Sequence, residues 1–285
     1  HNRVNFNEDI RNWNTNRVKN MEGMFKGASS FNQPIGEWET REVTNMESMF
    51  EGAEAFNKTI NTKPKVDVTE LENNKTITRK YWNTSWDVSN VTNMKNMFKG
   101  AKQFNQSINN WDTSKVTNMS GMFWGAAKFN QSVNPKVVTR IGTPNYTSWN
   151  TNNVNDMSHM FHDATSFNNN GNSLPLDGSN TINWDITSIT NMSHMFRGAT
   201  SFNALFDFSM SGTRIPYNLF GNKTIDMSYM FDNATNFNNG FPKGSSSNNS
   251  FVNWVVGSNT LVEWVLDMSY MFYEANSFNG DLSNW

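Results

Sequence analysis

The stretch Met119-Ser-Gly-Met-Phe-Trp-Gly-Ala-Ala-Lys-Phe-Asn130 decides how the rest of the sequence is interpreted. Its pattern, Met-x-x-Met-Phe-x-x-Ala-x-x-Phe-Asn, recurs in eight copies. Their first methionines are Met21, Met46, Met94, Met119, Met157, Met192, Met227 and Met268. A Trp stands eight residues before the first Met in six of the copies. Because self-similarity at a short period is the signature of repeat proteins, the chain is predicted to be an array of repeated units.

The spacing of the copies gives the length of the unit. Successive copies start 25, 48, 25, 38, 35, 35 and 41 residues apart, so the basic unit has 25 residues and five of the intervals carry insertions. We expect one domain over residues 1–285, with units beginning near residues 13, 38, 86, 111, 149, 184, 219 and 260 and partial units at both ends. A period of 25 lies in the range of leucine-rich repeats, in which each unit contributes a strand and a short helix.

Local signals within the unit favour the same fold. The residue before the first Met is always Asn or Asp, the residue types that cap helix N-termini. Six residues after that Met stands Gly, Asn or Asp in seven copies, with Glu274 the exception, and these types tolerate the left-handed conformation that ends helices. The Phe-Asn-x-x-apolar segment that follows is predicted to be a parallel strand, with its Asn side chains forming a ladder that satisfies backbone groups. The predicted fold is an α/β repeat solenoid with a short parallel strand and a short helix in each of eight units.

Composition excludes several classes of protein. The 285 residues include 23 basic and 25 acidic ones, and a net charge of −2 argues against a nucleic-acid partner. There is no cysteine, so disulfide frameworks and thiol nucleophiles are excluded. No apolar run approaches the roughly 18 residues of a membrane-spanning helix. The 49 Asn and 39 aromatic residues give a polar average with a rich apolar minority, which is what a repeat with apolar residues in constant positions produces.

The run from Asn110 to Gln131 resembles the BspA-like leucine-rich-repeat module, which is abundant in mycoplasma surface lipoproteins. The resemblance extends over nearly the whole chain, although the insertions depart from the family pattern and Leu219 and Thr260 replace the Trp in the last two units. It implies a location outside the cell or on its surface (or on a virion or filament) and a role in interaction, often adhesion. It implies no enzyme and no cofactor, and it supplies no binding residues.

The insertions give the first candidate site. All five occupy the same place in the unit, at residues 61–85, 134–148, 172–183, 207–218 and 242–259, and we expect them at one edge of the array. Aromatic residues dominate recognition sites because each buries a large area. The candidate residues for binding a protein or a glycan are Tyr81, Trp82, Tyr146, Phe251 and Trp254. The alternative interpretation is that these rings pack their own loops onto the array.

A second candidate lies two residues after each first Met. In the first four copies this position holds Gly23, Ser48, Asn96 and Gly121, and in the last four it holds His159, His194, Tyr229 and Tyr270. We expect these four rings to form a stripe on the outside of the array that contacts a partner laterally. The neighbouring Asp156, His162 and Asp163 suggest a metal site with His159, but two histidines without a third clear ligand predict none.

Charge adds an alternative function. Residues 1–142 contain 19 basic and 14 acidic residues, hence +5, whereas residues 143–285 contain 4 and 11, hence −7. Opposite ends of opposite charge favour head-to-tail association of copies. His1 in place of Met favours a processed product or a piece of a longer chain. No catalytic constellation is visible, so the sequence predicts a non-enzymatic, adhesin-like repeat protein or, alternatively, a structural subunit that assembles with itself.

Overall fold

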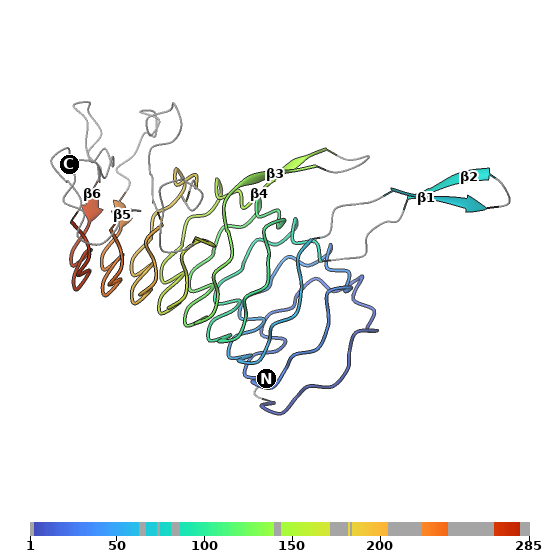
Figure 1. The fold of residues 1–285 in the computed structure, drawn as a ribbon, viewed down its shortest axis with the longest axis horizontal. Coiled ribbons are helices and arrows are strands. Elements are labelled where there is room, and N and C mark those ends of the chain that lie inside the picture. Colours follow the sequence, from blue (N-terminus) through green and yellow to red (C-terminus); the bar gives the residue numbers. More distant parts are fainter. Residues whose placement is uncertain are drawn as a thin grey trace.

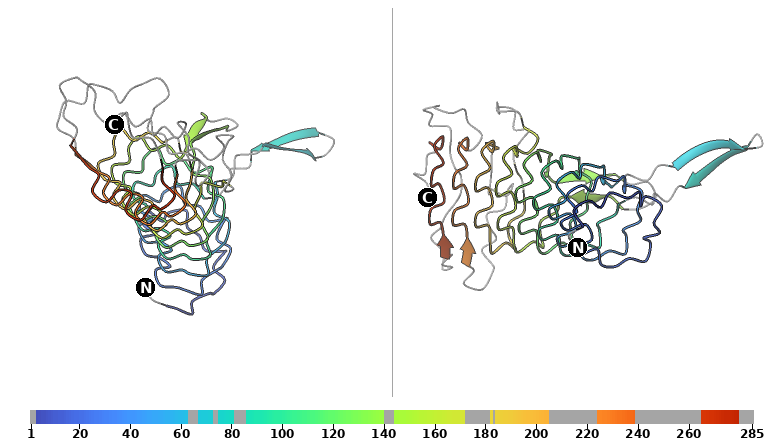
Figure 2. Two further views of the ribbon diagram at one scale, coloured as in Figure 1. Left: turned by 60° about the vertical axis from the view of Figure 1, so that its left-hand side comes forward. Right: turned by 90° about the horizontal axis from the view of Figure 1, so that it is seen from below.

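The computed structural model describes residues 3–62, 67–72, 75–80, 86–139, 144–171, 182, 184–204, 224–238 and 265–279. In these ranges the chain winds into coils that lie side by side, with the first and last copies of the repeat at opposite ends of the stack (Figure 1). Figure 2 shows the same stack from two further directions. Each coil contains one copy of the Met-x-x-Met-Phe pattern.

The described residues contain no helix, so the predicted α/β fold with one helix per unit is wrong. The Met-x-x-Met-Phe segment forms two β-turns instead. In the fourth copy, the Met122 N–H donates to the Met119 carbonyl at 3.2 Å and the Ala126 N–H donates to the Phe123 carbonyl at 2.9 Å. The third residue of each turn is a glycine with a positive φ, 60° at Gly121 and 67° at Gly125, as in a type II turn. A left-handed residue two positions after the first Met excludes a helix, which needs φ near −63° at every residue.

The predicted helix caps serve these turns. The Asn20 side-chain oxygen accepts a hydrogen bond from the backbone N–H of Glu22, two residues later, at 2.8 Å. All eight Asn or Asp residues at this place do the same, at 2.8 to 3.0 Å. This is an Asx-turn, in which the side chain imitates the backbone of a turn. The side-chain chemistry is that of an N-cap, but no helix follows.

Within the described ranges the strands are short and form three pairs. β1 (Asp67–Glu72) and β2 (Lys75–Lys80) are antiparallel, as are β3 (Lys136–Val138) and β4 (Tyr146–Ser148). These two hairpins lie in the first two insertions, and β1–β2 projects well beyond the coils (Figure 1). β5 (Thr224–Asp226) and β6 (Val265–Asp267) are parallel.

In the part of the chain that the structure describes, parallel strand pairing between coils occurs just before the first Met and not after Phe-Asn, so the predicted position of the strand is also wrong. β5 and β6 end at the Asp before the Met, and isolated parallel bridges join the equivalent residues of the other coils, from Asn20↔Asn45 onward. The pairing continues into the turns: the N–H groups of Met21, Gly23, Phe25 and Gly27 donate to carbonyls of the next coil at 2.7 to 2.9 Å.

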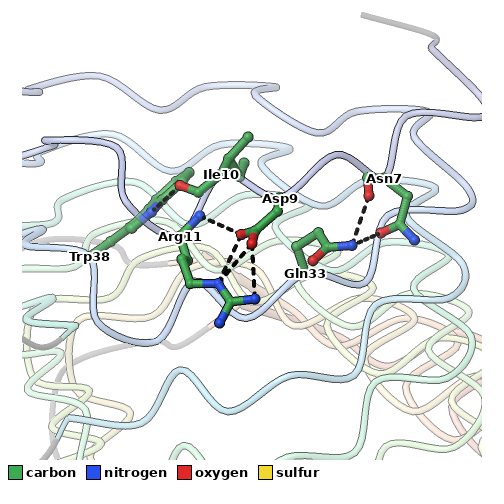
Figure 3. Close-up of polar contacts among 6 residues, drawn as sticks. All are labelled: Asn7, Asp9, Ile10, Arg11, Gln33 and Trp38. Atoms are coloured by element: carbon green, nitrogen blue, oxygen red, sulfur yellow. Dashed lines mark hydrogen bonds and ion pairs between the residues drawn. The ribbon is translucent and has the colours of Figure 1, made fainter.

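The predicted asparagine ladder is confirmed. The Oδ1 atom of Asn7 accepts a hydrogen bond from the Asn32 N–H at 2.9 Å, and Asn32 in turn accepts from Asn57 at 3.0 Å. The series continues through Asn105, Asn130, Asn168, Asn203, Asn238 and Asn279 at 2.7 to 3.0 Å. Further side chains link neighbouring coils: the Trp38 indole donates to the Ile10 carbonyl, and the Gln33 amide donates to Asn7 (Figure 3).

Two rows of stacked phenylalanines form the core. In one row, which runs from Phe25 to Phe272, neighbouring ring centroids are 5.3 to 5.6 Å apart. In the other, from Phe6 to Phe278, they are 5.7 to 6.0 Å apart. Both methionines of most copies and five of the seven described Trp residues complete this core. Burying one such side chain contributes roughly 1.5–3 kcal/mol, which explains how a chain with so many polar residues can form a stable core.

Candidate functional site

The structure describes one of the five insertion residues predicted to bind a partner. Tyr146 lies in β4, and its hydroxyl donates to the backbone carbonyl of Asn110 in the adjacent coil. At Tyr146 the ring therefore anchors its own hairpin to the coils. Tyr81, Trp82, Phe251 and Trp254 lie outside the described residues.

The second candidate occupies a distinctive backbone position. We call the residue two places after each first Met the edge residue. All eight edge residues have φ between 54° and 60°. Gly23 and Gly121 adopt this conformation freely, but any other residue there costs about 1–2 kcal/mol. In the last four copies the edge residues are His159, His194, Tyr229 and Tyr270, so this half of the molecule places large rings where glycine would be easiest to accommodate.

These four rings form the predicted stripe, and they stack face to face. The ring centroids of His159 and His194 are 4.6 Å apart, those of His194 and Tyr229 are 4.8 Å apart, and those of Tyr229 and Tyr270 are 4.8 Å apart. Their planes differ by 10° to 19°. Such contacts contribute about 0.5–1.5 kcal/mol each beyond area burial for aromatic pairs. Stacking therefore offsets part of the cost of the backbone conformation.

Two further rings extend the stripe: Trp124, which is not among the residues predicted from the sequence, and His162, which the sequence suggests only as a metal ligand. Trp124 and His162 stand five residues after the first Met of their copies, three residues beyond the edge residue. The Trp124 ring stacks on His159 at 4.8 Å and on His162 at 4.7 Å. The signal that could have revealed this is Gly121, the edge residue of the same coil, since a residue without a side chain leaves room for the Trp124 ring. We call the six residues together the aromatic edge: Trp124, His159, His162, His194, Tyr229 and Tyr270.

Two cations lie over this edge. The Lys99 ammonium is 3.9 Å from the centroid of the Trp124 ring, and the Arg197 guanidinium carbon is 6.0 Å from that of Tyr229. Both distances fall within the range of cation–π attraction. Arg197 also forms an ion pair with the nearly buried Asp232 at 2.9 Å. The aromatic edge thus holds positive groups of its own chain.

The histidines of the edge are held in the neutral form. Burial lowers the pKa of His159 to about 4, and repulsion from His194 acts in the same direction. Burial lowers the pKa of His162 to about 3, with further repulsion from His159. The pKa of His194 is also lowered, first by burial and then by Arg197. The Nδ1 atoms of His159 and His162 are 2.9 Å apart, a hydrogen bond that requires one donor and one acceptor and hence at least one neutral ring.

The chemistry that the aromatic edge offers is that of exposed rings. Within the described ranges, no group of three or more His, Cys, Asp or Glu residues is arranged to hold a metal ion. The edge does offer accessible aromatic surface at its last coil, because Tyr270 is 59% exposed and its neighbour Tyr273 is 53% exposed. The described residues also contain no helix that could cross a membrane.

Comparison with known proteins gives one result. No curated protein and no solved structure is significantly similar to the chain. The family described as "Mycoplasma protein of unknown function, DUF285" matches four overlapping segments, residues 1–81, 72–181, 143–243 and 175–285. Together these matches extend from one end of the sequence to the other, in keeping with the repeat found in every coil. The chain therefore belongs to this Mycoplasma repeat family.

Proposed function

We propose that the protein is a non-enzymatic repeat protein of a cell or particle surface that binds another protein or a glycan through its outer edge, in an adhesin-like role. The observation that carries the proposal is the aromatic edge. Its four edge residues are rings in a backbone conformation that glycine adopts at least cost, while the other four copies use glycine twice and the smaller Ser48 and Asn96. Strained residues of this kind persist where the side chain has a task.

Membership of a Mycoplasma repeat family supports this direction. The finer relationship, to the surface-displayed BspA-like repeat proteins, rests on the resemblance of residues 110–131 and belongs to the proposal. The helix-containing leucine-rich-repeat fold does not, because the coils are built from β-turns.

The test compares how the native chain and one variant bind to glycan arrays and to cell-surface proteins that are immobilised one at a time. The variant carries glycine at all four rings: His159→Gly, His194→Gly, Tyr229→Gly and Tyr270→Gly. Because Gly23 and Gly121 occupy the same backbone position, this variant is expected to keep its fold, which circular dichroism checks. Binding by the native chain that the variant loses would support the proposal. Binding by neither form, or by both equally, would refute it.

A second function, assembly of copies into a filament or coat, is favoured by the uneven charge. The first half of the sequence carries +5 and the second half −7, so head-to-tail or antiparallel contacts between copies are attractive. Sedimentation at increasing salt tests it: assembly should weaken as the salt concentration rises. A chain that stays monomeric at low salt and high concentration would exclude this function.

A further inference from the structure

The β1–β2 hairpin of the first insertion stands apart from the coils, unlike the β3–β4 hairpin of the second. In Figures 1 and 2 it projects from the stack in every view. The β3–β4 hairpin is tied to the coils, because Val138 and Ser148 are buried and the Tyr146 hydroxyl donates to the Asn110 carbonyl. Both hairpins occupy the same place in the repeat, so the repeat does not itself require a projecting hairpin.

The coils can form without this hairpin. Copies of the repeat that start 25 residues apart carry no insertion, and their coils pair through the bridges Asn20↔Asn45 and Asn93↔Asn118. The two coils that flank the hairpin pair in the same way, through Asn45↔Asn93. A two-stranded hairpin alone is at best marginally stable in water, and it gains stability when a further strand joins it.

Both edges of the hairpin can accept such a strand. β1 and β2 pair along their whole length, from Asp67↔Lys80 to Glu72↔Lys75, and within the described ranges neither pairs with a third strand. Six residues of edge strand present a row of N–H and C=O groups about 20 Å long. Neither strand contains proline or glycine, the residues that most weaken strand pairing.

The two strands carry opposite charge. β1 contains three acidic residues and no basic one, and β2 contains three basic residues and no acidic one: Asp67, Glu70, Glu72, then Lys75, Arg79 and Lys80. Charged residues often protect a sheet edge from pairing, and one sign on both edges would repel every other molecule of this protein. Opposite signs oppose contacts of β1 with β1 and of β2 with β2 but favour contacts of β1 with β2. The hairpin is therefore complementary to itself.

We propose that the β1–β2 hairpin is a docking surface for a second molecule of this chain, in which β1 of one molecule joins β2 of the other as a neighbouring strand. The partner is a second molecule of the same chain because the charge that favours each edge is the charge of the other edge. The contact is head-to-tail, so a pair of molecules keeps one free edge of each kind for a third. It deepens the second proposed function, assembly, and rests on it, but it does not depend on the aromatic edge.

Deleting the hairpin tests this surface. The variant has two glycines in place of residues 67–80 and should keep its coils, which circular dichroism checks, because copies without an insertion form the same coils. Sedimentation velocity at low salt should show self-association of the native chain, at least tenfold weaker in the variant. The association should also weaken at 1 M salt, where the Debye length is about 3 Å.

The outcomes of this experiment separate the docking surface from the assembly function. If the native chain and the deletion variant associate equally, the docking surface is wrong while assembly stands. If the native chain stays monomeric at low salt and high concentration, both are wrong.

Charge reversal assigns the contact to the two edges. One variant makes both strands acidic (Lys75→Glu, Arg79→Glu, Lys80→Glu), and another makes both basic (Asp67→Lys, Glu70→Lys, Glu72→Lys). Neither should associate alone, but their equimolar mixture should. The control carries all six substitutions, which restores opposite charges on the two strands and the native net charge, and it should associate within threefold of the native chain.

Mixing each single-sign variant with the deletion variant shows whether net charge alone drives association, and these mixtures should remain monomeric. Association in them, association of either single-sign variant alone, or a monomeric mixture of the acidic and basic variants would overturn the proposal.

Discussion

The first four coils and the last four coils build the same edge from different residues. In the first four, the edge residues are Gly23, Ser48, Asn96 and Gly121, and in the last four they are histidine and tyrosine rings. The backbone is alike in both halves, with φ between 54° and 60° at every edge residue. The rings are therefore no requirement of the fold, because residues without a ring support the same coil, and glycine does so at lower conformational cost.

The position five residues after each first Met changes character in the middle of the array instead. Lys26 and Glu51 form an ion pair at 2.8 Å there in the first two coils, and Arg197 and Asp232 form one at 2.9 Å in the sixth and seventh. Their counterparts in the fourth and fifth coils are Trp124 and His162, which join the aromatic stack. The comparison teaches that one coil geometry carries a polar surface in one region and an aromatic one in another, so the difference lies in the side chains alone.

The largest expected effect tests whether the cores of the two halves are equivalent. Phe98 and Phe161 are fully buried, and each stacks on a phenylalanine on both sides at 5.3 to 5.6 Å. Replacing either by Ala should lower the free energy of unfolding by about 3–5 kcal/mol, because a large cavity remains. Chemical denaturation of the two variants measures the loss of unfolding free energy in each. A clearly unequal loss would show that the halves differ in their cores as well as at the edge.

Acid should destabilise the aromatic edge selectively. Folding lowers the pKa of His159 to about 4 and of His162 to about 3, from 6.5. The folded state therefore favours the neutral rings, so the stabilisation is complete above pH 6.5 and is lost as the pH falls from there toward 4 and 3. Both rings keep some contact with solvent, so we expect a loss of about 1–3 kcal/mol, less than the full shifts would imply.

Thermal unfolding at pH 7.0 and pH 4.5 measures this loss. The control is the double variant His159→Asn with His162→Gln, which cannot titrate here and keeps at the edge a residue type, Asn, that Asn96 shows to fit. The variant should lose less stability than the native chain between the two pH values. An equal loss would assign the acid sensitivity to other groups.

The glycines of the first half give a smaller effect. A Cβ atom added at Gly121 would lie 2.2 Å from the Asn96 Oδ1 atom, and φ is 60° there. Gly121→Ala should lower the free energy of unfolding by about 1–2 kcal/mol, mainly through the left-handed backbone, since the Asn96 side chain can move. The double variant Asn96→Gly with Gly121→Ala should recover part of the loss. If the midpoint of denaturation is unchanged in Gly121→Ala, the left-handed backbone at the edge residue carries no measurable cost, and the argument from strain fails.

The features predicted correctly from sequence depend on local chemistry. The asparagine ladder follows from one residue type at one repeated position, and the left-handed residue six places after the first Met follows from Gly, Asn and Asp. Even Glu274, the exception in sequence, has φ 53°. The helix was wrongly predicted because Met, Met and Phe at i, i+3 and i+4 lie on one side of a helix and also of two consecutive turns. Gly23 and Gly121 marked the second left-handed residue, but His and Tyr at the same place in other copies obscured it.

For the candidate site, the sequence predicted the stripe but not its full extent. His159, His194, Tyr229 and Tyr270 share a position in the repeat, so their alignment follows from the period. Trp124, His162 and Lys99 come from a different position, and their contacts with the stripe depend on the direction of side chains in a turn that the sequence had assigned to a helix. Side-chain direction is fixed by backbone conformation. A wrongly predicted backbone therefore gives wrongly predicted side-chain contacts.

The smallest expected effect decides whether the rings serve stability or binding. Tyr229 stacks on His194 and on Tyr270, both at 4.8 Å, and has φ 56°. Tyr229→Gly removes two ring contacts of about 0.5–1.5 kcal/mol each and relieves a backbone cost of about 1–2 kcal/mol. The terms nearly cancel, so the free energy of unfolding should change by less than about 1 kcal/mol in denaturation experiments. Tyr229→Phe is the control that keeps the stack. A loss of several kcal/mol for Tyr229→Gly alone would mean that the aromatic edge holds the last coils together, and the argument that these rings are placed for a partner would fail.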